Sequence, residues 1–444
     1  MFIVGLGVAA ATSACAAGAQ DASVDTMLAR PLTLGDAARL AAHGNAAAQE
    51  ARYEADQATA RIIQARSDLL PNASAYVQEH GTVINTATFG FSLPGFDPGG
   101  QLLGPVNTID ARARLSQTIF DWAALSRVRS ARTAAVAGSA VANDAAEQAA
   151  SVAALAYLRA QRADAQLSAR TADSVLADSL LGIARDQLTA GVGVALDVTR
   201  AEAQVAAVRA QLIAARAERD RARLDLLRAL GLPLDAHVRL ADSLSALAMT
   251  DTLPNEQEAI ARALEQRPDL RAAEQQLLAA RQTANAIRAE RLPSLTAFGD
   301  EGFLGTNGGN KLNTYQWGVQ VSVPVFDGLR REGRVDEQQA RVREIDVRLR
   351  DLRQQTAIEV RGALLDLTSS HEAVDAAREQ LRLIEQEVAQ ARDRFRAGVS
   401  GNLDVITASL TLNSARTQLV DALASYQSAR VGLARALGAV TSLP

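Results

Sequence analysis

The fold is decided by two stretches that are copies of each other, ARDQLTAGVGVALDVTRAEAQ at residues 184–204 and ARDRFRAGVSGNLDVITASLT at residues 391–411. The copies extend without a gap over residues 184–231 and 391–438, at an offset of 207, with 22 identities in 48 positions. Ala-rich helices resemble one another by chance. They do not by chance place Ala-Gly-Val, Leu-Asp-Val and Arg-Ala-Leu-Gly in one register. The chain is therefore an internal duplication.

The remainder of the chain follows the same plan twice. A Leu-Pro pair ends at Pro71 and again at Pro293, and a Phe-Asp pair ends at Asp121 and again at Asp327. Each half is expected to contain a helix, a β-hairpin, a very long helix, a turn and a return helix. The predicted bounds are 1–19 for an export signal, 31–238 for the first repeat, 239–254 for a linker and 255–444 for the second repeat.

Two segments are long enough to form helices of unusual length. Residues 122–190 and 329–397 contain no proline and two glycines each. At 1.5 Å per residue, 69 residues give roughly 100 Å of helix, which is typical of coiled coils. The return helices carry a heptad seam, and the first of them has a second apolar stripe on its opposite side. Apolar stripes on opposite sides favour a closed wall of helices, and a simple antiparallel coiled coil is the alternative.

Four segments alternate apolar and polar residues as β-strands do. The cleaner two are 109–119 and 315–325, with weaker partners at 72–80 and 294–303, so hairpins are expected at about 72–120 and 294–326. Eleven alternating residues suit a transmembrane strand. Four strands cannot close a barrel, and open strand edges are not tolerated in lipid. Three copies would supply twelve strands. The alternative is a small soluble sheet that caps a helical stalk.

Composition and the N-terminus narrow the function further. The net charge of −4 provides no basic surface for nucleic acid. Residues 2–11 are apolar, and an A-x-A site at residues 17–19 predicts an exported chain cleaved before Gln20. Cys15 is an alternative site, for lipidation. The four histidines are scattered, and no nucleotide-binding or hydrolase motif is present, so neither an enzyme nor a cofactor is expected.

These motifs together resemble the TolC-like outer-membrane efflux family. The matching pieces are LTLGDAARLAAHGN from Leu32, the Leu-Pro before each first strand, VPVFDGLRR from Val323, and the tip motifs AGVGVALDV and AGVSGNLDV. The resemblance implies a mainly α-helical homotrimer with a twelve-stranded β-barrel in outer-membrane lipid, continued by an α-helical barrel. It also implies a periplasmic adaptor and an inner-membrane RND pump or ABC exporter as partners.

The resemblance places the periplasmic entrance at the two helix–turn–helix tips, about 190–198 and 397–405. It assigns Asp404 to an acidic constriction and Asp197 to a gate-locking acid. Ser400 stands where the best-known member has a latch arginine, Phe395 replaces its tyrosine, and Thr407 replaces its second acid. These substitutions argue against a latch of the same chemistry. Gly191 and Gly398 follow the long helices and are expected to adopt the left-handed conformation that ends a helix. Tip turns and adaptor docking are expected at Gly191, Gly398, Val192, Val399, Leu196 and Leu403.

The tips also have a purely local interpretation. Asp197 and Asp404 each follow a turn and open a helix, where a carboxylate can satisfy free N–H groups and interact with the helix dipole. Two other functions remain open at this point: a periplasmic coiled-coil scaffold without a pore, and a soluble adaptor of the same export systems. An adaptor would need lipoyl-like and small β-barrel domains, for which the chain has no room.

Overall fold

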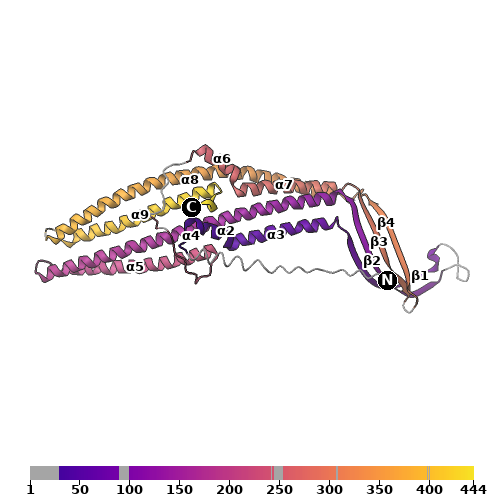
Figure 1. The fold of residues 1–444 in the computed structure, drawn as a ribbon, viewed down its shortest axis with the longest axis horizontal. Coiled ribbons are helices and arrows are strands. Elements are labelled where there is room, and N and C mark those ends of the chain that lie inside the picture. Colours follow the sequence, from indigo (N-terminus) through magenta and orange to yellow (C-terminus); the bar gives the residue numbers. More distant parts are fainter. Residues whose placement is uncertain are drawn as a thin grey trace. The chain divides into compact units, whose positions relative to one another are not determined.

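The computed structural model describes residues 30–89, 100–241, 243–244, 254–306, 309–397, 399 and 401–444. The export signal, Cys15, Gly398, Ser400 and most of the 239–254 linker lie outside the described residues. Two very long helices dominate the chain: α4 spans Trp122–Thr189 and α8 spans Arg330–Arg396 (Figure 1). Both begin and end within one residue of the predicted bounds.

Shorter helices and four strands complete the chain. The return helices are α5 (Ala195–Leu230) and α9 (Asn402–Ala436). The other helices are α2 (Leu34–Gly44), α3 (Ala46–Ser67), α6 (Glu256–Gln266) and α7 (Pro268–Ala289). The strands are β1 (Asn72–Asn85), β2 (Leu102–Asp121), β3 (Ser294–Thr306) and β4 (Leu312–Ser322). None of the described helices is both long enough and apolar enough to cross a bilayer.

The chain forms two compact units, and neither coincides with a sequence repeat. Of the described residues, one unit contains those within 30–53, 140–271 and 350–444, and the other contains those within 54–139 and 272–349. Each unit therefore takes a segment from both repeats. The long helices α4 and α8 each run through both units.

The second unit holds a single antiparallel sheet in the order β1-β2-β3-β4. The two predicted hairpins are joined through β2 and β3, where Arg114 lies opposite Asp300. Within the described strands, β1 and β4 each pair along one side only. The sheet therefore keeps two edges with unpaired backbone groups.

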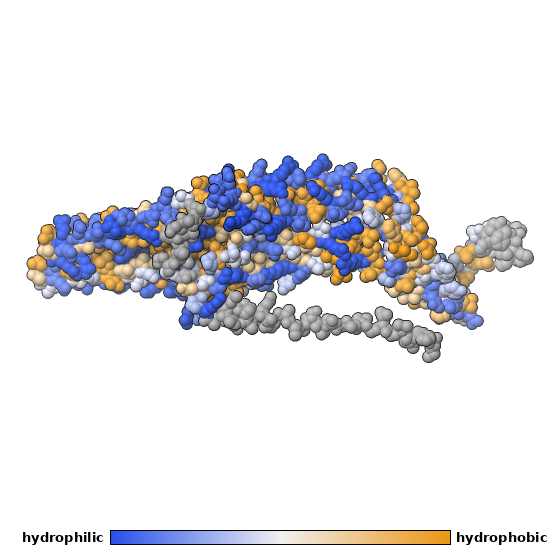
Figure 2. Space-filling view, turned by 45° about the horizontal axis from the view of Figure 1, so that its top comes forward, coloured by the Kyte–Doolittle hydropathy of each residue, from blue (hydrophilic) through white to orange (hydrophobic). Residues whose placement is uncertain are grey.

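The two faces of the sheet differ in chemistry. One face carries Asp110, Arg112 and Asp300, with Arg112 Nε 2.7 Å from Asp110 and its Nη1 3.1 Å from Asp300. The other face carries a row of apolar side chains, and Trp317 on it is 80% exposed. Figure 2 shows hydrophobic residues gathered over the strands. An apolar face of this kind needs a cover other than water.

Strand β4 ends earlier than predicted. Alternation continues to Val325, but the strand stops at Ser322. Pro324 has no N–H to donate to a ladder, and its carbonyl instead accepts a hydrogen bond from Arg331 Nη2 at 3.3 Å. Residues 323–325 therefore belong to the connection that leads into α8.

The largest core lies in the first unit. It is built from α2, the second part of α4 and the end of α5, with many alanines among its buried residues. Fully buried Tyr157 donates its hydroxyl proton to the carbonyl of Leu32 at 2.8 Å. Leu32 also bridges to Leu240, so the first residues of the predicted linker are fixed against α2.

The return helices show both predicted stripes. In α9 the heptad seam is buried, and Leu412 packs with Ile384 and Val388 of α8. In α5 much of the second stripe is open, and Ile213 is 61% exposed in the single chain. An unpartnered stripe on α5 is what a wall of helices from more than one chain requires.

Candidate functional site at the helix-hairpin tips

The first tip is closed by Gly191, which ends α4. Its φ is +76°, the left-handed conformation that the sequence predicts for this position. The N–H of Gly191 donates to Leu188 O at 3.0 Å, and those of Val192 and Gly193 donate to Gln187 O at 3.1 and 2.9 Å. The carbonyls of Gln187 and Leu188, in the last turn of α4, are thus satisfied by the turn itself.

The second tip joins α8 to α9, and Gly398 and Ser400 in it lie outside the described residues. The predictions for these two residues, a left-handed turn and the position of a latch arginine, stay predictions. Among the described residues of this tip, Val399 donates its N–H to Arg394 O at 3.0 Å and is exposed.

Two side-chain amides hold the tips to each other within the first unit. Gln187 Nε2 donates to the carbonyl of Phe395 at 2.9 Å. Asn402 Nδ2 donates to the carbonyl of Asp197 at 2.9 Å, and Asn402 is fully buried. Each bond runs from one hairpin to the other, so the two tips form one structure rather than two independent ends.

An apolar cluster reinforces the joined tips. Phe395 is 2% exposed and packs with Leu180 and Ala184 of α4, Ala201 of α5 and Val405 of α9. Its ring therefore serves as packing between the hairpins of one chain. The sequence singles out Phe395 as an entrance residue, and the structure gives it this internal position.

The two aspartates have different surroundings. Asp197 is partly buried, with Oδ1 3.6 Å from Arg200. Asp404 is exposed, and within the described part of the chain no hydrogen bond or ion pair reaches its carboxylate. Both lie in the first helical turn, where they interact favourably with the dipole. The N-cap positions belong to Val194 and Gly401, and among the described residues no backbone N–H donates to either carboxylate.

Thr407, the remaining predicted entrance residue, lies one turn further along α9. It is exposed, and its hydroxyl donates to the carbonyl of Leu403 at 2.9 Å. The hydroxyl therefore forms its hydrogen bond within its own helix. It contributes no charge to the tip.

The apolar side chains predicted for docking that the structure describes, Val192, Leu196, Val399 and Leu403, are all exposed. Val192 is 80% exposed and Val399 is 70% exposed, and the space-filling view shows hydrophobic residues at the hairpin ends (Figure 2). We call this surface the tip patch: Val192, Val194, Leu196, Val399 and Leu403. Val194 was not singled out from the sequence, although it lies inside the duplicated motif.

A buried ion cluster links α4 to α9 further from the tips. The Asp173 carboxylate is fully buried and lies 2.9 Å from Arg416 Nη1 and 3.2 Å from Arg170 Nη1. The Asn413 amide, with its nitrogen turned toward Asp173, donates to Oδ1 at 2.7 Å. Burial raises the pKa of Asp173, and the two arginines counteract that rise. The cluster is a specific polar contact in an otherwise Ala-rich seam.

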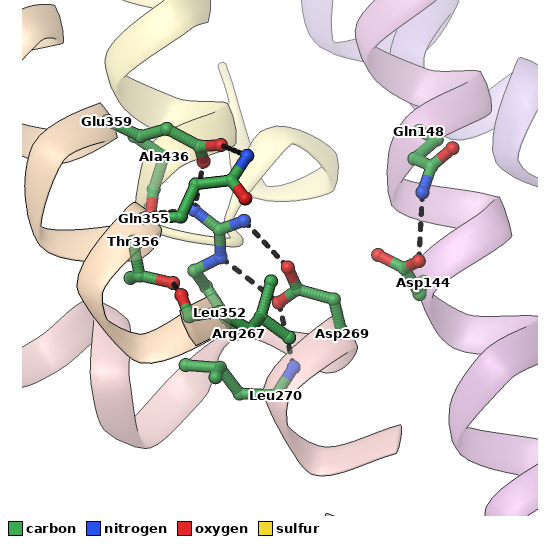
Figure 3. Close-up of polar contacts among 10 residues, drawn as sticks. All are labelled: Asp144, Gln148, Arg267, Asp269, Leu270, Leu352, Gln355, Thr356, Glu359 and Ala436. Carbon is green, nitrogen blue, oxygen red and sulfur yellow. Dashed lines mark hydrogen bonds and ion pairs between the residues drawn. The ribbon is translucent and has the colours of Figure 1, made fainter. Parts of the chain in front are cut away.

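A second polar cluster, also in the first unit, surrounds the junction of α6 and α7 (Figure 3). Arg267 is bound by Asp269 at 2.6 Å and by Glu359 of α8, and it also reaches the carbonyl of Ala436 at the end of α9. These carboxylates raise the pKa of Arg267 against the effect of its burial. Asp144 of α4, bound to Gln148, has its pKa raised by burial and by the charge of Asp269. The contacts are those of a structural junction.

Asn402 and Asp173 were missed by reasoning from the sequence. The signal for Asn402 is its alignment with Ala195 in the other copy, because a polar residue there needs a partner. Asp173 gives no local signal, since a lone Asp on a long helix resembles a solvated residue. Within the described ranges, no group of three or more His, Cys, Asp or Glu side chains is placed to hold a metal ion.

Comparison with known proteins agrees with this architecture. The toluene efflux pump outer membrane protein TtgF of Pseudomonas putida is 29% identical over 296 residues, 64% of this chain and 59% of that protein. The pyoverdine export outer membrane protein OpmQ of Pseudomonas aeruginosa is 28% identical over 63% of this chain and 58% of its own length. The chain thus matches less than two thirds of the length of these relatives.

Solved structures share the fold. The open state of the MtrE outer membrane channel of Neisseria gonorrhoeae superposes with a TM-score of 0.75, covering 92% of this chain and 89% of that one at 21% identity. The family model described as outer membrane efflux protein matches residues 37–232 and 259–439, the greater part of both repeats. The chain belongs to the outer membrane efflux protein family.

Proposed function

We propose that the chain is one subunit of a homotrimeric outer-membrane channel, a passive duct for export and not an enzyme. Three four-stranded sheets would close a twelve-stranded barrel in the outer membrane. The long helices of three chains would form an α-helical barrel that continues the duct into the periplasm. The four-stranded sheet, open at both edges and apolar on one face, is the observation that carries this proposal.

The sheet supports a trimer because of how its backbone must be satisfied. Unpaired N–H and C=O groups at an edge cost several kcal/mol each in hydrocarbon, so an isolated four-stranded sheet cannot remain in lipid. Pairing β4 of one copy with β1 of the next satisfies both edges. The apolar face with Trp317 then contacts lipid, and the face with Arg112 lines the duct.

The joined tips are proposed as the periplasmic entrance. In a trimer, Asp404 becomes three carboxylates around one axis, and its exposure leaves the charge available to the duct. Like charges in a narrow mouth concentrate cations and repel anions. The tip patch, with its exposed Val192 and Val399, is proposed as the docking surface for a periplasmic adaptor.

The complete export system would contain that adaptor and an inner-membrane RND pump or ABC exporter. The named relatives serve toluene efflux and pyoverdine export. They favour efflux of small molecules by this chain over secretion of proteins. No cofactor is part of the proposal, and no contact with nucleic acid.

Conductance across a planar bilayer tests the proposed function. Purified protein in detergent should insert as discrete conducting units, because a closed barrel encloses water. A matched sample with β4 disrupted by Val319→Pro, which breaks an internal ladder position, should not conduct. Membrane insertion without any conductance by the unaltered protein would overturn the proposal.

A further inference from the structure

The parts of α7 and α8 that lie in the second unit border a groove lined by arginines. They run side by side (Figure 1), and the groove between them has a volume of about 540 Å³. Arg281 and Arg288 line it from α7, and Arg343 lines it from α8. Asn285 and Gln339 add amide groups, and no carboxylate is among the lining residues.

Three of the acids on the same helical segments are bound elsewhere. Glu290 pairs with Arg334 at 2.8 Å, and Glu332 pairs with Arg291 at 2.6 Å. Glu344, next in sequence to Arg343, pairs with Arg348 at 3.6 Å. The three groove arginines form no ion pair with a carboxylate of the described residues, and the lining of the groove itself carries three positive charges and no negative one.

The other face of α7 provides a contrast. There a second groove, shared with α4 and α8, is lined by Arg127 and Arg334 together with Glu290 and Glu337. Its acids and bases balance. The lining of this second groove therefore lacks the excess of arginine that characterises the first.

The duplication supplies an internal comparison. Counting back from Pro293 and Pro71, Arg281 corresponds to Thr59, whereas Arg288 corresponds to Arg66. Counting forward from Asp327 and Asp121, Arg343 corresponds to Ala137. The first repeat thus has one arginine where the second has three. Packing of the shared fold does not require the other two.

We propose that the groove between α7 and α8 binds a phosphate group. Guanidinium groups bind phosphate oxygens through paired, charge-assisted hydrogen bonds. Arg281 and Arg288 are two turns apart on one face of α7, roughly 10 Å along its axis, so both can reach a ligand that lies along the groove. Arg343 faces them from α8.

The phosphate is assigned to a lipid headgroup at the periplasmic surface of the outer membrane. Helix α7 ends at Ala289 and strand β3 begins at Ser294, so Arg288 lies only six residues before the sheet. The source of the phosphate rests on the proposed function, because only that function puts the sheet in a membrane. The phosphate chemistry of the groove does not depend on it.

Retention of phosphatidylglycerol in detergent micelles tests the site. The triple variant R281Q/R288Q/R343Q is compared with unaltered protein and with R209Q/R216Q/R221Q, which removes the same charge from exposed positions of α5. Native mass spectrometry counts bound phosphatidylglycerol, with diacylglycerol as the lipid that lacks phosphate. Loss of charge-assisted bonds should reduce retention about tenfold in the groove variant alone.

A second measurement tests whether the groove binds free phosphate. The melting temperature of the protein is measured in inorganic phosphate and in chloride at equal ionic strength.

The outcomes are separable. Stabilisation by inorganic phosphate without lipid retention would keep the phosphate site and overturn its lipid source. Equal retention by the groove variant and the unaltered protein, or an equal loss in the α5 control, would overturn the proposal. Should the triple variant fail to fold, Arg343→Gln alone must still lower retention. Conductance of the same samples reports on the proposed function independently, because the groove variant should conduct normally.

Discussion

Gly191 is the residue whose conformation the tip most depends on. Its positive φ lies in a region that a β-branched residue enters only at a strain of about 1–2 kcal/mol, and no atom lies within 4 Å of an added Cβ. Gly191→Val should therefore distort the turn and leave the trimer intact. Dye efflux from cells that carry the cognate pump should fall, while the trimer band on a native gel persists.

Gly182 provides the matched control. It lies within α4, it is exposed, and a Cβ added there would meet nothing within 4 Å. Gly182→Val places the same residue in an ordinary helical position. Efflux should remain normal, and equal losses in both variants would show that the turn is not the cause.

Asp404 carries the predicted charge of the entrance. Because its carboxylate is exposed and unpaired within the described residues, Asp404→Asn removes three charges per trimer with little effect on folding. Cation selectivity should weaken, and the reversal potential under a potassium chloride gradient measures it. Asp197→Asn should shift the potential less, because that carboxylate is partly buried beside Arg200. An unchanged reversal potential in Asp404→Asn would leave only the dipole role.

The conformation of a single residue can be predicted from the sequence where its own backbone preferences decide that conformation. The left-handed turn at Gly191 follows from glycine itself. The burial of Phe395 and the bond from Asn402 to Asp197 depend on two hairpins more than 200 residues apart in sequence. Nothing in the residues around Asn402 specifies that partner.

At the scale of elements, the seam between α4 and α9 depends on the buried Asp173 cluster. Asp173→Asn leaves Arg170 and Arg416 without their common anion. Breaking a buried ion pair by removing one partner typically destabilises by about 3–5 kcal/mol. The melting temperature of the purified protein should fall by several degrees.

Asp164→Asn is the control for that change. Asp164 also lies on α4, and it pairs with Arg223 of α5 at 3.1 Å, but this pair is largely solvated. Such pairs contribute about 0–1 kcal/mol, so the melting temperature should hardly move. An equal loss in both variants would mean that the buried cluster has no special role.

The ends of helices and strands were predictable from the sequence where a local residue, such as a glycine, terminates the element. The long helices stop at Thr189 and Arg396, because glycines follow and no proline interrupts them. Strand β4 was predicted three residues too long, because alternation continues past Pro324 although hydrogen bonding cannot. The polar residues Asn413 and Thr417 interrupt the apolar pattern of α9, and they contact Asp173 and Arg170 of α4.

At the scale of the molecule, the duplication in sequence does not divide the structure. Both compact units draw on both repeats, since each long helix contributes to both units. A repeat by itself would have half a sheet and unpaired helices. The order in which segments meet in space depends on pairing between β2 and β3, which no local pattern encodes.

Lys311 offers a direct test of orientation. It is the only lysine of the 444 residues, and it is exposed in the connection between β3 and β4. We predict that this connection faces the cell exterior and that the tips face the periplasm. A membrane-impermeant amine reagent should label Lys311 on intact cells, with Lys311→Arg correcting for the N-terminal amine.

The tip arm of the orientation test uses Val192→Cys in a background without Cys15. An impermeant maleimide should reach this cysteine only after the outer membrane is permeabilised. If the tip is labelled on intact cells and Lys311 is not, the orientation is the reverse of the predicted one.

The central claim is that three chains complete one barrel, and the mass of the purified complex tests it most directly. Light scattering corrected for detergent should give the mass of three copies, because twelve strands close where four cannot. A monodisperse monomer or dimer that still inserts into membranes would contradict the account.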